Sequence, residues 1–300
     1  MNPSFKARLL IAYMRIRRAK RDLEDLELFR RELSDRDDAL EIEPPDSLSG
    51  QFEVSRELIA GRPVFTIAAS GAADAAAILY LHGGGHFLQA REAHWWTAGE
   101  LAQRTRCPVI FPLTALTPLA NCDDVLPWLL DVYRSIASGE VAAIAGDSAG
   151  AGAALALAQL VREAGLAQPK LIVLFSPWLD LSMRHAAEGD QLDGRDPMLA
   201  VPGLIEAGRL WAGTRAIDDP LVSPVDLDLT GLAPVEIHAG TRDILINDAR
   251  RLAARGRESG HPIELTEHRG LFHVFMTIPM PETDRVLTQV AEKIGVAQGI

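Results

Sequence analysis

The chain has 300 residues, a net charge of −11 and a hydrophobic fraction of 48%. A chain of this length buries about three-quarters of its unfolded surface, so extended disorder is excluded over most of it. The acidic balance argues against nucleic acid as a partner, because phosphate recognition relies on a clustered basic face.

The only cysteines are Cys107 and Cys122. Two thiols are too few for a disulfide framework or a four-ligand zinc site, so we expect no structural metal and a reducing, cytoplasmic location. No run approaches 18 uninterrupted apolar residues, and the apolar stretch 9–14 is short and followed at once by arginines. We therefore expect neither a membrane span nor a secretory signal.

Residues 5–34 are predicted to form one long helix. Leu9, Ile16 and Leu23 recur every seven residues and would form a single apolar stripe that docks on another surface. Prolines at 44 and 45 end the pattern. The basic residues between positions 6 and 21 are interpreted as the solvated side of this helix, with a membrane-surface or partner contact as the alternative.

From residue 51 the pattern alternates between short strands and helices. Strands are predicted near residues 52–58, 63–68, 76–82, 108–113, 141–145, 170–175, 234–239 and 262–267, and helices near 91–105, 123–138, 149–164, 245–258 and 283–294. Several strands are apolar without alternation, which is typical of a parallel sheet covered on both faces. The pattern predicts an α/β fold with a mostly parallel central sheet of about eight strands.

One stretch, residues 180–230, contains no predicted strand. It would be inserted between the sixth and seventh strands, at the carboxyl edge of the sheet. Such an insertion is well placed to cover a crevice in which a ligand binds.

The strongest local motif is Gly-Asp-Ser-Ala-Gly at 146–150. It follows a predicted strand and opens an alanine-rich helix. A serine at such a sharp strand-to-helix turn is exposed at the edge of the sheet, and small neighbours leave room for close packing. The start of the helix also directs amides and a positive dipole end towards this point. The motif predicts Ser148 as a nucleophile.

A second motif, His-Gly-Gly-Gly at 82–85, directly follows the strand that ends at Leu81. Consecutive glycines leave backbone amides uncovered, which suits donation to a developing oxyanion. A triple glycine alone also fits a flexible turn. Together with the serine turn, it indicates the machinery of acyl transfer.

A serine nucleophile requires a base and an orienting acid, which follow it in the order acid then histidine in α/β hydrolases. His273 lies in a loop after the last strand, and His268, at that strand's end, is the alternative base. Asp243 follows the seventh strand and is the favoured acid, with Asp180 and Asp248 as alternatives.

With these motifs, the chain resembles the hormone-sensitive-lipase-type esterases, an α/β-hydrolase family marked by HGGG and GDSAG, from about residue 76 to 295. The segments 176–180, 196–197 and 219–224 add to the likeness in combination. The resemblance implies a triad of Ser148, Asp243 and His273, with oxyanion donors from Gly84, Gly85 and Ala149. It also implies a single domain over 1–300 with a cap made of 1–45 and about 180–220, and a homodimer paired through the strand at 262–267.

The chain departs from the family pattern at three places. The family's Tyr-Arg-Leu-Ala-Pro-Glu stretch is replaced by Pro-Leu-Thr-Ala-Leu-Thr-Pro at 112–118, and Ala151-Gly152 stands where Gly-Asn is usual. His268 lies near the position of a glutamate. These changes concern substrate preference and the support of the triad, and leave the triad itself intact.

Several residues near the motifs have more than one interpretation. Trp95 and Trp96 would either line an acyl pocket or anchor the helix after the glycine motif, and Trp211 would face the site from the insertion or pack elsewhere. His86 is interpreted as a packing residue, and Asp147 as a structural hydrogen-bond partner.

The function predicted from these features is that of a serine carboxylesterase that hydrolyses short- to medium-chain esters through an acyl-enzyme, without a cofactor. Hydrolysis of a lactone, amide or carbamate on the same triad is the first alternative. A ligand-binding receptor, as in the plant hormone receptors on this fold, is disfavoured by the complete triad. A membrane-associated lipase would rest on the basic first helix.

Overall fold

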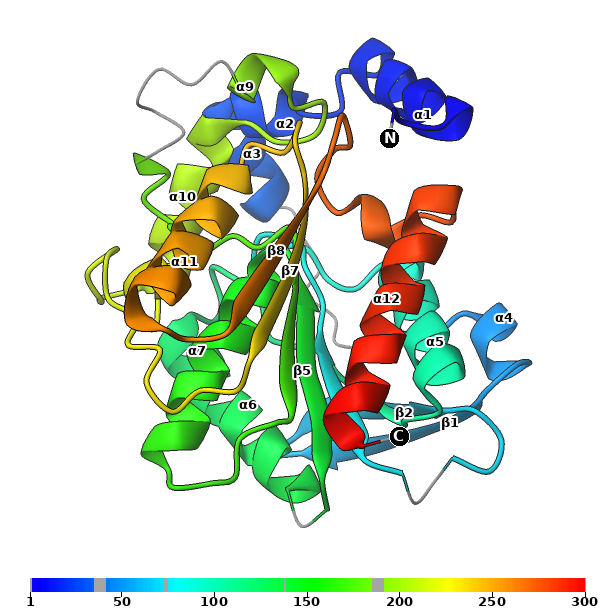
Figure 1. The fold of residues 1–300 in the computed structure, drawn as a ribbon. Coiled ribbons are helices and arrows are strands. Elements are labelled where there is room, and N and C mark those ends of the chain that lie inside the picture. The colour runs from blue at the N-terminus through cyan, green and yellow to red at the C-terminus, as the bar shows by residue number, and fades with distance from the viewer. Residues whose placement is uncertain (1, 35–41, 73–74, 138, 185–191, 300) are drawn as a thin grey trace.

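The computed structural model describes residues 2–34, 42–72, 75–137, 139–184 and 192–299. Its centre is an eight-stranded sheet in the order β1-β2-β4-β3-β5-β6-β7-β8 (Figure 1). The strands are β1 (Glu53–Ile59), β2 (Arg62–Ala68), β3 (Ala77–Leu81), β4 (Val109–Pro112), β5 (Val141–Asp147), β6 (Leu171–Phe175), β7 (Val235–Gly240) and β8 (Ile263–His268). Among the described strands, β2 alone runs opposite to the other seven. The predicted mostly parallel sheet is confirmed.

The apolar strands lack alternation because both faces of the sheet are covered. In β3, Ile78 and Tyr80 belong to the core on one face, while Leu79 and Leu81 belong to the core on the other. All four side chains are at most 3% exposed. A strand in this position gains burial from every residue, which favours a continuous apolar run.

Helices cover the sheet on both sides (Figure 1). On one side lie α5 (Glu92–Thr105) and α12 (Pro281–Gln298), and on the other α6 (Cys122–Ile136), α7 (Ala149–Glu163) and α11 (Ile246–Ser259). Each matches a helix expected from the sequence to within a few residues. The two layers place every strand-to-helix turn of the parallel sheet at the same edge.

Trp95 anchors α5 on the sheet. It is 2% exposed, and its ring lies 5.1 Å from that of Phe65 and 4.4 Å from that of Phe111. Trp96, on the same helix, faces a separate surface hollow beside Leu48. Of the two interpretations of these tryptophans, the structure therefore supports the anchor of the helix and not the lining of an acyl pocket.

The single helix predicted over residues 5–34 is wrong. The segment forms α1 (Phe5–Ile16), α2 (Arg21–Glu24) and α3 (Leu26–Ser34), and α4 (Asp46–Ser49) follows further along the chain. The first break includes Arg18, whose φ is 50°, and the second lies at Asp25, whose backbone is extended. The Asp25 carboxylate accepts the amides of Glu27 and Leu28 at 3.1 Å, so it caps the helix that follows.

The predicted apolar stripe is also not the buried face of α1. Ala7 and Ile11 are buried, whereas Leu9 is 60% exposed and Ile16 80% exposed. The seven-residue repeat is interrupted because the helix ends before it can continue. The two buried residues, Ala7 and Ile11, are instead four positions apart, which is an ordinary spacing along one face of a helix.

The insertion contains α9 (Leu192–Arg195), α10 (Val201–Ala212) and the 3₁₀ turn η1 (Pro224–Asp226). Within 180–184 and 192–230 there is no strand, as predicted, and 185–191 lie outside the described residues. Helix α10 packs against α2 and α3 near the carboxyl ends of the parallel strands (Figure 1). None of the helices in the described ranges is long and apolar enough to cross a membrane.

Candidate active site

Ser148 lies at the turn between β5 and α7, with φ 53° and ψ −121°. A positive φ is strained for a residue with a side chain, and the neighbouring structure must hold it. The Ser148 amide donates to the Phe175 carbonyl at 2.9 Å, and its carbonyl accepts the Trp178 amide at 3.1 Å. Both partners lie at or after the end of the adjacent strand β6, so the sheet itself fixes the turn.

The structure brings Ser148, His273 and Asp243 together. Nε2 of His273 is 2.9 Å from Oγ of Ser148, and Nδ1 is 2.9 Å from Oδ2 of Asp243. Asp243 is fully buried, and its Oδ1 accepts the Leu245 amide at 2.9 Å. The three residues come from the ends of β5 and β7 and from the loop after β8. One ring nitrogen can therefore accept a proton from the hydroxyl while the other donates to the carboxylate.

The pKa of His273 is raised above its usual value of 6.5. Burial on its own would lower this pKa, because it disfavours the charged imidazolium. The negative charge and hydrogen bond of Asp243 outweigh burial, and Asp196 adds a smaller effect in the same direction. The site therefore stabilises the imidazolium that a general base forms when it accepts a proton.

The alternative acids and base are occupied elsewhere. Asp180 accepts the hydroxyl of Ser182 at 2.5 Å through Oδ1, and Asp248 accepts the amides of residues 179 and 180. Burial raises the pKa of Asp248 to about 7. Nε2 of His268 lies 3.1 Å from Nδ1 of His238. Within the described residues, none of these groups forms a hydrogen bond with Ser148 or His273.

Ser176 supports the histidine loop and was not singled out in the sequence. Its Oγ accepts the amide of Val274, the residue after His273, at 3.1 Å. Val274 has a φ of 45°, which is unusual for a β-branched residue. This hydrogen bond links the end of β6 to the turn that presents the imidazole. The only sequence signal for it was the start of the Ser-Pro-Trp segment.

Asp196 is a second supporting residue that sequence reasoning did not assign. It is 2% exposed, and its Oδ2 accepts the amide of Ile244, next to Asp243, at 2.9 Å. Its Oδ1 accepts two amides of its own turn, from Met198 and Leu199. Burial, followed by the charge of Asp243, raises its pKa to about 6. The insertion thus holds the acid loop through one carboxylate.

The glycine motif lies against the serine turn, as its expected role requires. Gly84 has φ 118° and Gly85 φ 62°, conformations that favour glycine, and within the described residues neither amide donates a hydrogen bond. Ala149 is the first residue of α7, so its amide has no carbonyl one turn earlier. Gly150 lets α7 approach β3: a Cβ at this position would collide with the carbonyl oxygens of Leu81 and His82.

Asp147 joins the two motifs. Its Oδ1 accepts the Tyr80 hydroxyl at 2.7 Å and the Gly83 amide at 3.0 Å, and its Oδ2 lies 3.6 Å from Nε2 of His94. Burial would raise the pKa of this carboxyl, but His94 and the two hydrogen bonds lower it below its usual value. The interpretation of Asp147 as a structural hydrogen-bond partner agrees with these contacts.

His86, directly after the glycine motif, is a packing residue. Its ring stacks on that of Trp211 with centroids 3.6 Å apart and an interplanar angle of 7°. Burial, with the nearby His82, lowers the His86 pKa to about 3, so the ring is neutral near pH 7. The stack joins the glycine loop to α10, so Trp211 faces the loop from the insertion.

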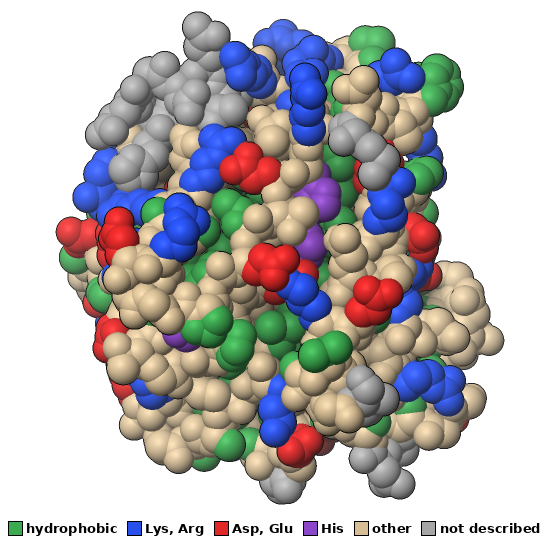
Figure 2. All heavy atoms as spheres, viewed as in Figure 1, with side chains coloured by type: hydrophobic (Ala, Val, Ile, Leu, Met, Phe, Trp, Pro, Cys, Tyr) green, Lys and Arg blue, Asp and Glu red, His purple; other side chains and the backbone are tan. Residues whose placement is uncertain are grey.

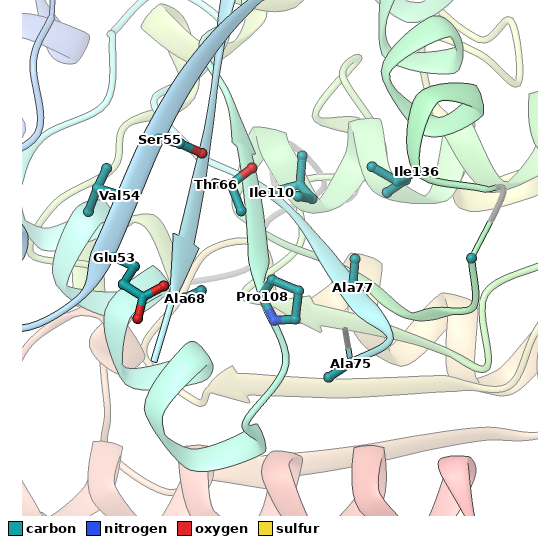
Figure 3. A pocket seen from close by; sticks show the side chains of 11 residues that line it. Glu53, Val54, Ser55, Thr66, Ala68, Ala75, Ala77, Pro108, Ile110 and Ile136 are labelled. Atoms are coloured by element: carbon teal, nitrogen blue, oxygen red, sulfur yellow. The ribbon is translucent and has the colours of Figure 1, made fainter. Parts of the chain in front are cut away.

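A surface hollow of about 600 Å³ lies at the opposite end of the sheet (Figure 3). Its walls come from β1, β2 and the starts of β3 and β4, with Ser55, Thr66 and Pro108 among the labelled side chains. Among the described residues that line it, Glu53 is the only charged one. The hollow therefore has no part in the triad. Among the residues that the structure describes, no cluster of side chains could hold a metal ion.

The fold and this geometry define a serine hydrolase built on a parallel sheet. A family model described as alpha/beta hydrolase fold matches residues 78–277, and the chain belongs to that family. An acetyl-hydrolase of Streptomyces hygroscopicus is 34% identical over 208 residues, 67% of this chain and 69% of that protein. An esterase of Acinetobacter venetianus is 29% identical over 224 residues, 72% and 73% of the two chains.

The similar solved structures are also esterases and lipases. A hormone-sensitive lipase from a metagenome library is 26% identical, with a TM-score of 0.82 over 99% of each chain. An esterase of the bacterial hormone-sensitive lipase family is 26% identical, with a TM-score of 0.80 over 98% of each chain. The resemblance expected from the two glycine motifs is confirmed.

Proposed function

We propose that this chain hydrolyses carboxylic esters of short to medium chain length through an acyl-enzyme on Ser148. The class, a carboxylic ester hydrolase, agrees with the names of the relatives, which include an acetyl-hydrolase, an esterase and a carboxylesterase. The observation that carries the residue assignment is the continuous hydrogen-bonded series from Ser148 through His273 to Asp243, with both distances 2.9 Å.

In this proposal Oγ of Ser148 attacks the ester carbonyl while Nε2 of His273 accepts the hydroxyl proton. The amides of Gly84, Gly85 and Ala149 hold the oxyanion, and His273 then returns the proton to the departing alcohol. Water activated by His273 cleaves the acyl-enzyme in the second half of the reaction. Asp243 holds the imidazole in the tautomer that each step needs.

A fluorophosphonate probe tests this assignment, because it labels only an activated serine. We expect the wild type to be labelled, and Ser148→Ala to lose both labelling and roughly 10⁶-fold in turnover of a p-nitrophenyl ester. Ser182→Ala, a serine on the insertion side, is the matched control and should label normally. Failure of the folded wild type to label would overturn the proposal and favour the ligand-binding receptor.

The choice among ester, lactone, amide and carbamate depends on the pocket rather than on the triad. We favour esters because the relatives' names specify ester and acetyl hydrolysis. A series of p-nitrophenyl esters, lactones and anilides tests this choice: turnover of the short esters should exceed turnover of the other classes. Faster turnover of a lactone or anilide would replace the ester assignment while leaving the serine mechanism in place.

We also propose that the chain is one domain on which residues 1–45 and about 180–220 form a cap, because α10 contacts α2 and α3. We propose a cytoplasmic location, which the two free, buried thiols of Cys107 and Cys122 support.

We further propose that β8 pairs two copies of the chain into a homodimer, because this strand lies at the edge of the sheet. Light scattering after size exclusion tests the dimer, since a monomeric mass would contradict it.

A further inference from the structure

Helix α1 leaves a row of large apolar side chains in water. Phe5, Leu9, Tyr13 and Ile16 are 75%, 60%, 58% and 80% exposed. They account for four of the seven exposed large hydrophobic residues in the described part of the chain. At 100° per residue they fall within one sector of the helix, opposite the buried face. An exposed apolar row this concentrated indicates an interaction surface.

The opposite face of α1 attaches the helix to the domain. Ala7 and Ile11 are buried in the core shared with α12, and Leu10 and Met14 pack against it. The Ser4 amide donates to Glu282 Oε1 at 2.6 Å, and the Lys6 ammonium donates to the Pro279 carbonyl. The helix is therefore held with its apolar row pointing outward.

Basic residues border the apolar row on both sides. In the helical projection Arg8 and Arg15 fall along one border, and Lys6 and Arg17 along the other. Seven basic and no acidic residues occur in 1–21, although the whole chain carries a net charge of −11. Figure 2 shows basic and hydrophobic side chains together along the upper edge of the molecule, over α1 and α2.

An apolar row between two basic borders matches the surface of an anionic bilayer. The apolar side chains enter the boundary between headgroups and acyl chains, while the arginines and lysines remain beside lipid phosphates. A second copy of α1 would bring two basic borders together, which charge repulsion disfavours. We propose that α1 binds the protein peripherally to anionic phospholipid membranes, with its axis in the plane of the interface.

Flotation with two kinds of vesicle tests this proposal on the full-length protein. We expect it to float with vesicles of phosphatidylcholine mixed with phosphatidylglycerol, and much less with vesicles of phosphatidylcholine alone. Leu9→Glu or Ile16→Glu should each weaken binding by about tenfold or more. The triple variant Arg8→Gln, Arg15→Gln, Arg17→Gln should weaken it on the order of a hundredfold.

Val296→Glu is the matched control, because Val296 is 75% exposed at the other end of the fold, near the C-terminus. It should bind vesicles like the wild type. Melting temperature and hydrolysis of a water-soluble p-nitrophenyl ester should be unchanged in Leu9→Glu, since this side chain touches neither core nor triad.

Three results would overturn the proposal. In the first, the wild-type protein does not float with the anionic vesicles. In the second, Val296→Glu weakens vesicle binding as much as Ile16→Glu does. In the third, the protein binds neutral and anionic vesicles equally well. A dimer that Leu9→Glu converts to a monomer in light scattering would instead assign the row to a second copy of the chain.

Discussion

Two buried histidine–carboxylate pairs lie within or just beyond the last two strands of the sheet, β7 and β8. In the first, Nδ1 of His273 is 2.9 Å from Asp243, and in the second, Nε2 of His238 is 2.8 Å from Glu236. Both imidazoles are at most 3% exposed. The pairs differ in what the other ring nitrogen meets: Ser148 Oγ in the first, and Nε2 of His268 in the second.

The difference teaches that a buried histidine–carboxylate pair is not by itself a catalytic feature. Glu236 and His238 lie within β7, where their side chains are enclosed by the sheet and by α12. Asp243 and His273 lie in loops beyond the strand ends, where a substrate carbonyl can approach Ser148. In the proposed mechanism, position at the carboxyl edge of a parallel sheet separates the reactive pair from the structural one.

The largest expected effect separates the two histidines. His273→Ala should lower kcat/KM for a p-nitrophenyl ester by roughly 10⁶-fold, because it removes the base. His238→Asn should stay within about tenfold of the wild type, and lose about 1–3 kcal/mol of unfolding free energy, because Glu236 loses a buried partner. Steady-state kinetics and urea unfolding measure both. A folded His238→Asn protein without activity would make the second pair part of the catalytic machinery.

The two carboxylates provide the next comparison. Asp243→Asn keeps the shape but presents the wrong partner to the imidazole, and should lower kcat/KM by about 10⁴-fold. Glu236→Gln should change it by no more than a few-fold. Equal losses in both variants would contradict the distinction between the pairs. Thermal melting of each variant checks that the fold is retained.

The pattern along the chain was sufficient to predict the sheet and the residues that the structure brings together at Ser148. Each of these residues stands at a place that local chemistry marks: a glycine-flanked serine after a strand, or an acid or histidine just past a strand end. Strands without alternation also predicted that both faces would be covered. Each of these signals is local in the sequence. The marked residues come together because the carboxyl ends of the parallel strands meet at one edge of the sheet.

The supporting residues and the N-terminal segment could not be predicted in the same way. Ser176 and Asp196 act on amides at Val274 and Ile244, and nothing in sequence spacing specifies such long-range partners. The break at Arg18 and the outward orientation of Leu9 depend on which face of α1 packs against the core. Apolar periodicity identifies a stripe but not the side on which it is buried.

The pH dependence of kcat/KM gives a smaller effect that still distinguishes the pairs. The proposed mechanism requires neutral His273, and the raised pKa of His273 keeps the imidazole protonated to higher pH. Activity should therefore be half-maximal above pH 6.5 and fall about tenfold per pH unit below that point. Burial, with His238 and Arg285, lowers the His268 pKa to about 4, so His268→Gln should leave the midpoint unchanged. A midpoint that moves in His268→Gln would contradict this separation.

The smallest expected effect concerns Asp196, which holds the acid loop and raises the His273 pKa through its charge. Asp196→Asn should lower kcat/KM about tenfold and shift the pH midpoint downward, because a neutral amide stabilises the imidazolium less. Asp131→Asn removes an equal charge from the surface and should leave the midpoint in place, since solvent and salt screen it. If Asp196→Asn lowered activity without moving the midpoint, the carboxylate would act on the loop's position alone. A variant with wild-type rate and midpoint would remove Asp196 from the support of the triad.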